Sequence, residues 1–318
     1  MGKSGRKNFY FIKIVRIEEV GMILQKNSKV GIVCCSNGQL PSYKEDIESL
    51  EKALLDIGLI PVFSEFIYAT DSVFSGTPKE RAKALMDFYK DDEIQAIFDI
   101  SGGDIANEIL PYLDFDIIRN SGKRFWGYSD LTTILNAIYA KTGCASVLYQ
   151  VKNLVWHDSK RQIADFESIV IEKEDEKQSV KDKEIQKSSL FSPEYKFVQK
   201  ESMEGIVVGG NIRCLLKLAG TPYWPDMDQK ILLLESLGGE VPQMVTYLNQ
   251  LKQIGVFEKI NGILLGTFTT MEKNQCQPDI VSLVKEYAGT EVPIAVTKEI
   301  GHGKDSKAIV IGKYMSLN

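Results

Sequence analysis

Histidine is scarce in this sequence, with His157 and His302 as the only two imidazoles in 318 residues. A metal centre built on several histidine ligands needs more imidazoles than the chain has. The glycine-rich turn at Gly102 and Gly103 also lacks the G-x-G-x-x-G and Walker lysine patterns of nucleotide-binding loops. We therefore expect no metal and no cofactor.

The five cysteines form an odd set without a C-x-x-C pair: Cys34, Cys35, Cys144, Cys214 and Cys276. This argues against both a disulfide framework and a structural zinc site, and it is typical of reduced, intracellular thiols. Long apolar runs are absent too, because segments such as ILLL at 231–234 fall far short of the roughly 20 residues that span a membrane. We expect a cytoplasmic protein with no membrane partner.

Neither sign of charge dominates, since 38 Lys and Arg oppose 43 Asp and Glu, for a formal net charge of −5. Such a balance gives no electrostatic footprint for nucleic acid, so we expect no nucleic acid partner. The chain is long enough for a sizeable core and two domains. Residues 1–28 begin basic, but charges interrupt their apolar residues and no cleavage site follows, which indicates an extension outside the fold rather than a secretory signal.

From Lys29 onward, short apolar runs alternate with amphipathic helical stretches, the pattern of parallel strands connected by helices. We predict an α/β fold with a first domain at 29–150 and a second α/β domain at 205–318. Between them, at 151–204, the pattern weakens and a mixed-charge run appears, so we place the domain connection there. Within the first domain, Pro78 is expected to open a helix.

Two turns of the first domain carry candidate functional residues. QAIFDIS runs into Gly102-Gly103, and RFWGYS ends at Ser129-Asp130 before a helical stretch. Both turns are expected at the carboxyl edge of a parallel sheet, where ligands usually bind. Ser129 there can present a hydroxyl to a cleft, whereas helix capping by Ser129 or Asp130 and a plain tight turn at the glycines are the structural alternatives.

The second domain contributes a histidine and a glutamate. His302 lies between two glycines, which free the backbone and expose the ring, although a lone loop histidine is more often structural. Glu235 ends the apolar strand 231–234, where a carboxylate needs a partner or solvent. A carboxylate that accepts from a histidine N–H fixes the tautomer of the ring during proton transfer. Taken singly, each residue is ambiguous.

Taken together, these segments resemble the LD-carboxypeptidase family. The resemblance is carried by SGGDIANEILPYLDFDIIRNSGKRFWGYSDLTTILNAIYAKTG, followed in family order by GGNIRCLLKLAGTPYWPD, ILLLES, LNQLKQIGVFEKINGILLG and the late GHG. It covers nearly the whole chain from Lys29, and its main gap is the middle segment. The family's Gly-Pro after the K-T-G turn is replaced here by ASVLYQVKN.

The resemblance implies a role for each candidate. The family's Ser-Glu-His triad falls on Ser129, Glu235 and His302, so residues 29–150 form the nucleophile domain. Backbone N–H groups of Gly103 and Asp130 are implied as the oxyanion hole. The implied fold is a Rossmann-like N-terminal domain with a C-terminal α/β domain of swivelling type, and homodimers are frequent in the family.

Three functions remain open. The first is cleavage of the bond between an L-centre and a terminal D-amino acid, usually D-alanine, in cytoplasmic murein tetrapeptides, as part of peptidoglycan recycling. The second is microcin C immunity, in which related enzymes cleave peptidyl or aminoacyl nucleotides. The third, of another class, is non-catalytic peptide binding on the same scaffold. Gly102 and Trp156 are the candidate substrate contacts, and Trp156 would be the aromatic platform for a nucleobase.

Overall fold

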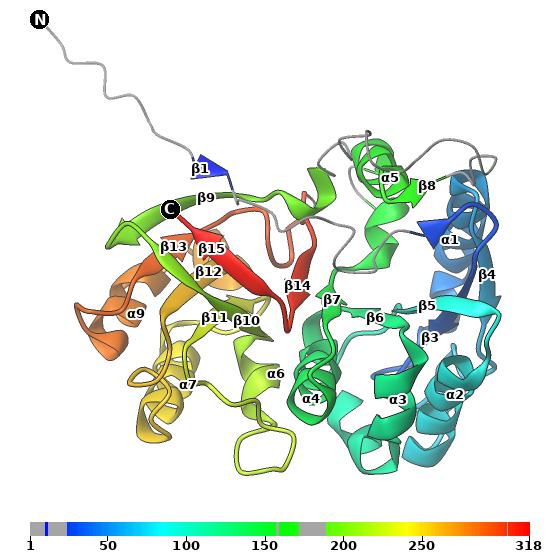
Figure 1. Ribbon diagram of the computed structural model, residues 1–318, viewed down its shortest axis with the longest axis horizontal. Helices are drawn as coiled ribbons and strands as arrows, with labels where there is room; N and C mark the ends of the chain where they lie inside the picture. The colour runs from blue at the N-terminus through cyan, green and yellow to red at the C-terminus, as the bar shows by residue number, and fades with distance from the viewer. Residues whose placement is uncertain (1–9, 12–23, 157–158, 172–188, 304) are drawn as a thin grey trace, which may run out of the picture.

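The computed structural model describes residues 10–11, 24–156, 159–171, 189–303 and 305–318. These residues form two domains, each built on a β-sheet with helices against it (Figure 1). The two-domain α/β fold that the sequence predicts is confirmed. No helix within the described ranges is long and apolar enough to cross a membrane.

The first sheet has the strand order β14-β7-β6-β5-β3-β4 among the described residues. Strands β7, β6, β5, β3 and β4 are parallel, and β14 runs antiparallel to β7 at the edge. The strands are β3 (Lys29–Val33), β4 (Ile60–Phe63), β5 (Ile94–Asp99), β6 (Arg124–Gly127), β7 (Ser146–Leu148) and β14 (Ile309–Ile311). The helices are α1 (Lys44–Ile57), α2 (Pro78–Lys90), α3 (Phe115–Ser121), α4 (Thr132–Thr142) and α5 (Ser159–Glu167).

The second sheet has the order β1-β9-β13-β12-β11-β10-β15, with a parallel centre from β13 to β10. Its strands are β1 (Tyr10–Phe11), β9 (Glu194–Gln199), β10 (Met203–Asn211), β11 (Lys230–Ser236), β12 (Gly262–Phe268), β13 (Ile294–Val296) and β15 (Tyr314–Leu317). Its helices are α6 (Ile212–Leu216), α7 (Val241–Gln253), α8 (Thr269–Lys273) and α9 (Ile280–Ala288).

Helix α2 begins as the sequence predicts. Pro78 occupies its first turn, and Thr77 accepts a hydrogen bond from the Glu80 backbone N–H while the Glu80 side chain accepts from the Thr77 backbone N–H. This reciprocal cap satisfies two N–H groups that have no partner inside the helix. The expected helix start at Pro78 is confirmed.

Three segments differ from the simplest division of the chain. Strand β1 and strand β2 (Leu24–Gln25) lie within residues 1–28, which were expected outside the fold, and they pair with β9 and with β8 (Val170–Ile171). Segment 151–204 contributes α5 and β9. Strand β14, from the 205–318 range, completes the first sheet beside β7 (Figure 1). An open sheet edge accepts a strand from any part of the chain, so periodicity alone does not give its partner.

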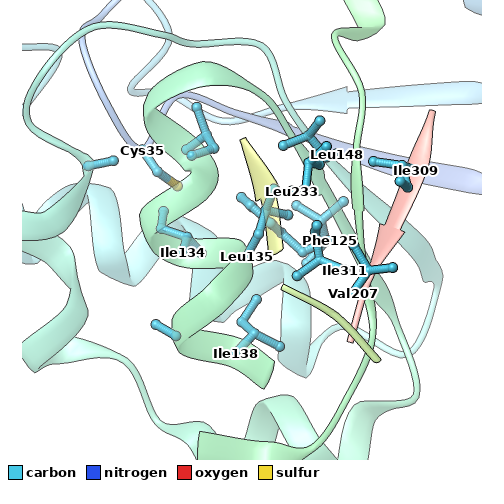
Figure 2. Close-up of a cluster of buried hydrophobic side chains, with 14 of the residues drawn as sticks. Cys35, Phe125, Ile134, Leu135, Ile138, Leu148, Val207, Leu233, Ile309 and Ile311 are labelled. Atoms are coloured by element: carbon cyan, nitrogen blue, oxygen red, sulfur yellow. The ribbon is translucent and has the colours of Figure 1, made fainter. Parts of the chain in front are cut away.

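The two domains share one apolar core around α4. Figure 2 shows side chains of α4, of the second sheet and of β14 gathered in this cluster. Full burial of such an aliphatic side chain stabilises a fold by about 1.5–3 kcal/mol relative to exposure. The labelled members include Ile134, Leu135, Ile138, Val207, Leu233, Ile309 and Ile311.

Side chains of α4 contact the backbone of β10 directly. The Asn136 side chain donates to the Gly209 carbonyl at 2.9 Å and accepts from the Gly209 N–H at 2.8 Å. A Cβ at Gly210, where φ is +134°, would lie 2.6 Å from Thr132 Oγ1. Only glycine allows so close an approach. The amino end of α4, next to Ser129, is therefore held against the end of β10.

Candidate active site

Ser129 lies at the sharp turn between β6 and α4. Its φ of +54° is in the left-handed region, which non-glycine residues rarely adopt. Such strain persists only where the surrounding structure enforces it, and it is typical of nucleophiles on strand-to-helix turns. The Ser129 hydroxyl makes no cap of α4, since the residue before that helix is Leu131 and no side chain caps it. The capping alternative for Ser129 is therefore wrong.

Ser129, His302 and Glu235 form one hydrogen-bonded chain. His302 Nε2 is 3.1 Å from Ser129 Oγ, and His302 Nδ1 is 2.7 Å from Glu235 Oε2. The His302 side chain is 8% exposed and that of Glu235 is fully buried. With Nδ1 protonated, the ring donates to the carboxylate and leaves Nε2 free to accept the serine proton. The arrangement suits nucleophilic catalysis by a serine.

Strand pairing brings Glu235 to the serine turn. In the parallel pair β10 and β11, Asn211 lies opposite Glu235. The Asn211 backbone N–H in turn donates to Thr132 Oγ1 at 3.0 Å, and Thr132 begins α4 just after Ser129. The carboxyl ends of strands from both sheets thus meet at one point. This meeting explains how residues more than 100 positions apart share a site.

The loop that carries His302 depends on a glycine. Gly301 has a φ of +126°, and a Cβ there would lie 2.3 Å from Thr267 Oγ1 and 3.3 Å from Glu235 Oε2. Thr267 Oγ1 also accepts the His302 backbone N–H at 3.2 Å. A side chain at position 301 would therefore push the loop away from Glu235. The need for backbone freedom beside His302 is confirmed at Gly301, whereas the expected exposure of the ring is wrong, since the His302 side chain is only 8% exposed.

Tyr128 packs on the imidazole, a contact that sequence reasoning missed. Its ring centroid is 4.4 Å from that of His302. Burial and the negative charge of Glu235 raise the pKa of Tyr128 well above its usual value, so the phenol stays neutral. No sequence pattern distinguishes Tyr128, because an aromatic residue at the end of a strand usually packs in the core. Here the ring limits the orientations open to His302.

The second candidate turn lies beside the serine turn, at the end of the adjacent strand β5. Gly103 has a φ of +127°, and a Cβ there would overlap the Asn37 side chain. The Asn37 backbone N–H donates to the Gly102 carbonyl at 3.2 Å, and Asn37 Oδ1 accepts from the Asp104 N–H at 3.1 Å. Glycine is thus required at 103, while a Cβ at Gly102 would meet only open space.

The Asp130 side chain bonds to residues of other segments rather than capping α4, the helix that follows it. This fully buried carboxylate accepts from Ser36 Oγ at 2.7 Å, from the Ala106 N–H at 2.8 Å and from Lys217 Nζ at 2.5 Å. The capping alternative for Asp130 is therefore wrong as well. Lys217 comes from the end of α6, and nothing in its sequence pattern distinguishes it from a solvated helix lysine.

The described contacts of Trp156 are with α1 and Lys152, and they include neither Ser129, His302 nor Glu235. Its Nε1 donates to Asp46 Oδ2 at 3.2 Å, and the Lys152 ammonium lies 4.4 Å from its ring centroid. These contacts anchor the ring by a hydrogen bond and a cation–π interaction. His157 lies outside the described residues. Within the described part of the chain, no cluster of three or more His, Cys, Asp or Glu could hold a metal ion.

Comparison with known proteins gives the family of both domains. Residues 30–149 match the sequence model of the LD-carboxypeptidase N-terminal domain, and residues 204–317 match that of the LD-carboxypeptidase C-terminal domain. Together these matches cover well over half of the chain. Neither match includes residues 150–203, where the apolar pattern weakens.

Individual relatives point the same way. A Bacillus subtilis protein named "Probable murein peptide carboxypeptidase" is 28% identical over 304 residues, covering 93% of this chain and 90% of the relative. The Escherichia coli microcin C7 self-immunity protein MccF is 29% identical over 216 residues, covering 62% and 63%. A solved structure of MccF with glutamyl sulfamoyl guanosine shares the fold, with a TM-score of 0.77, 23% identity and coverage of 93% and 97%. The chain is therefore a serine peptidase and belongs to the LD-carboxypeptidase family.

Proposed function

We propose that this serine peptidase is a carboxypeptidase that cleaves the L–D peptide bond of murein tetrapeptides and releases the terminal D-alanine. The observation that carries the proposal is the hydrogen-bonded chain from Ser129 through His302 to Glu235, assembled from both domains. The proposal includes a cytoplasmic, homodimeric enzyme that recycles wall fragments.

The reaction begins with the serine hydroxyl. Ser129 Oγ attacks the carbonyl carbon on the L-side of the bond, and its proton passes to His302 Nε2 across the 3.1 Å hydrogen bond. Glu235 stabilises the imidazolium that forms, through the bond at 2.7 Å. His302 then donates the proton to the departing D-alanine nitrogen. Water, activated by the same ring, releases the peptide from the acyl-enzyme.

The tetrahedral intermediate needs donors for its oxyanion. Backbone N–H groups of Gly103 and Asp130 are the proposed pair, because their turns end the adjacent strands β5 and β6. Glycine at 103 permits the conformation of that turn, where φ is +127°. Such preorganised donors stabilise charge that develops only in the transition state.

A terminal carboxylate in the substrate calls for a cation near these turns. The half-exposed Arg213 guanidinium donates to the Gly103 carbonyl at 3.1 Å and pairs with Asp104. Arginine recognises carboxylates through two parallel N–H groups. Arg213 is therefore our candidate for the D-carboxylate.

Incubation with a defined murein tetrapeptide tests the proposed reaction. We expect mass spectrometry to show the loss of one alanine from the peptide, and the released alanine to be the D-enantiomer. The same peptide with a terminal L-alanine is the control and should remain intact. If both peptides stay intact while a peptidyl sulfamoyl-adenylate is cleaved, the murein proposal is wrong and immunity-type hydrolysis takes its place.

The immunity-type alternative requires a surface on which a nucleobase can stack. Trp156, its candidate platform, already has one ring face against Lys152 and its N–H bonded to Asp46. These contacts favour an anchoring role and so favour the murein substrate. Under the alternative, Trp156→Ala should abolish cleavage of the adenylate. A scaffold that only binds peptide predicts that neither substrate is cleaved.

Glu235→Gln should lower kcat on the order of 10⁴-fold, as loss of the orienting carboxylate does in other triads. The glutamine keeps the shape of the buried side chain, and its carbonyl can still accept from His302 Nδ1. What it lacks is the negative charge that stabilises the imidazolium. Glu235 Oε1 has no hydrogen-bond partner among the described residues, so the new amide group displaces no existing bond there. Turnover per folded enzyme, compared between the variant and the wild type, checks the prediction. A near-normal kcat would contradict it.

A further inference from the structure

One buried carboxylate connects the ends of three neighbouring strands. Asp130 follows β6, its partner Ser36 follows β3, and its partner Ala106 belongs to the segment that follows β5. These strands are adjacent in the order β6-β5-β3. The Asp130 side chain is fully buried, and a buried charge is tolerated only when it is paired and hydrogen-bonded. Its only charged partner among the described ion pairs is Lys217.

Lys217 joins the two turns that carry the proposed oxyanion donors. Its ammonium, 19% exposed at the side-chain level, donates to Asp130 Oδ1 at 2.5 Å and to the Asp104 carbonyl at 2.8 Å. Asp104 directly follows Gly103, whose backbone N–H is the first proposed oxyanion donor. The backbone N–H of Asp130 is the second. One ammonium, supplied by the second domain, therefore contacts both turns of the first domain.

We propose that Lys217 is a positioning residue that sets the spacing of the two oxyanion-binding turns. The inference rests on the proposed serine mechanism. Its ammonium touches neither the nucleophile nor His302, so its effect passes through Asp130 and Asp104. Because it sits at the end of α6, the donors reach their final spacing only when the two domains are docked. Misplacement of a catalytic group by about 1 Å can cost about 10²-fold in rate.

Lys217→Met tests this role, since methionine keeps much of the apolar stem and removes the ammonium. We expect kcat to fall about 10²-fold while KM stays within about threefold, because the substrate's ground state does not use the oxyanion donors. Lys217→Arg should recover most of the rate, because a guanidinium can also donate to both oxygens. A packing defect that lowers the folded fraction would also reduce apparent kcat at constant KM, so kcat is expressed per folded enzyme, and recovery by Lys217→Arg separates the two explanations.

A fluorophosphonate probe measures the same geometry without any peptide substrate. Ser129 Oγ bonds to phosphorus as the P–F bond breaks, the serine proton passes to His302 and fluoride leaves. The phosphoryl oxygen occupies the place of the oxyanion, so Lys217→Met should slow labelling about 10²-fold. If the wild-type enzyme labels but releases no D-alanine, the murein proposal fails, while the comparison of labelling rates still tests Lys217.

The matched control is Lys123→Met. Lys123 is also half-buried and donates to backbone carbonyls, including those of Phe88 and Tyr89 at 2.8 and 2.9 Å. It precedes β6 and so lies at the opposite edge of the same sheet from Ser129. Its loss should lower Tm without slowing the labelling of the folded enzyme.

A double variant covers the case in which Lys217→Met does not fold. Asp130→Asn with Lys217→Met removes both buried charges, which avoids an unpaired carboxylate. It should fold and still be labelled about 10²-fold more slowly than the wild type, because no ammonium bonds to both turns. Labelling by folded Lys217→Met, or by the double variant, at a rate within about threefold of the wild type would overturn the proposal.

Discussion

Ser129→Ala is expected to lower kcat on the order of 10⁶-fold, the loss that follows removal of the nucleophile in a serine triad. Alanine lacks the oxygen that bonds to the substrate, and no other hydroxyl is described within hydrogen-bonding distance of His302 Nε2. The backbone at 129 already adopts a φ of +54° with a non-glycine residue, so alanine adds little strain. Tm should therefore change little. D-Alanine release and thermal unfolding measure the two quantities.

Ser146→Ala is the control for this loss. Ser146 is buried in β7 and donates to the Leu135 carbonyl at 3.3 Å, away from the imidazole. The control should keep wild-type turnover. Near-normal turnover by Ser129→Ala would instead show that another group attacks the substrate.

His302→Ala should lower kcat by a similar amount, on the order of 10⁶-fold, because a triad acts as a unit. Without the ring, the serine proton has no acceptor and the leaving nitrogen has no donor. The double variant Ser129→Ala with His302→Ala should be little worse than either single change. This strong non-additivity, measured by turnover of all three proteins, separates a shared mechanism from two independent effects.

Loss of His302 should also affect stability. The buried Glu235 carboxylate would lose its hydrogen bond from Nδ1, and hydrogen bonds to charged groups contribute about 1.5–3 kcal/mol. Urea denaturation should show a decrease of that order in the free energy of unfolding. His157→Ala, which alters the other histidine of the chain, should leave turnover unchanged. If His157→Ala abolished turnover and His302→Ala did not, the assignment of the base would be wrong.

Much of the fold can be predicted from local pattern. The apolar runs at 96–98 and 231–234 lie in the buried parallel strands β5 and β11, and the proline at 78 marks a helix start. Partners of edge strands could not be predicted. The sequence of β14 is an ordinary apolar strand, and its place beside β7 follows from an open edge and the shared core rather than from periodicity.

Some residues of the site could also be predicted from the sequence, and others could not. Ser129, Glu235 and His302 are ambiguous singly, and their order within motifs that resemble one family made them candidates. Tyr128, Thr267 and Lys217 were not predicted, because each acts through a contact between elements distant in sequence. Lys217 in particular looks like a solvent-facing lysine until α6 is packed against the Asp130 turn.

Trapping of the acyl-enzyme tests the central claim most directly. Wild-type enzyme is mixed with the murein tetrapeptide, quenched in acid within the first turnover, digested and mapped by mass spectrometry. The expected result is a covalent adduct of the tripeptide, the substrate without its terminal D-alanine, on the peptide that contains Ser129, with no adduct in Ser129→Ala. An adduct on a different residue, or D-alanine release by Ser129→Ala at the wild-type rate, would contradict the proposed mechanism.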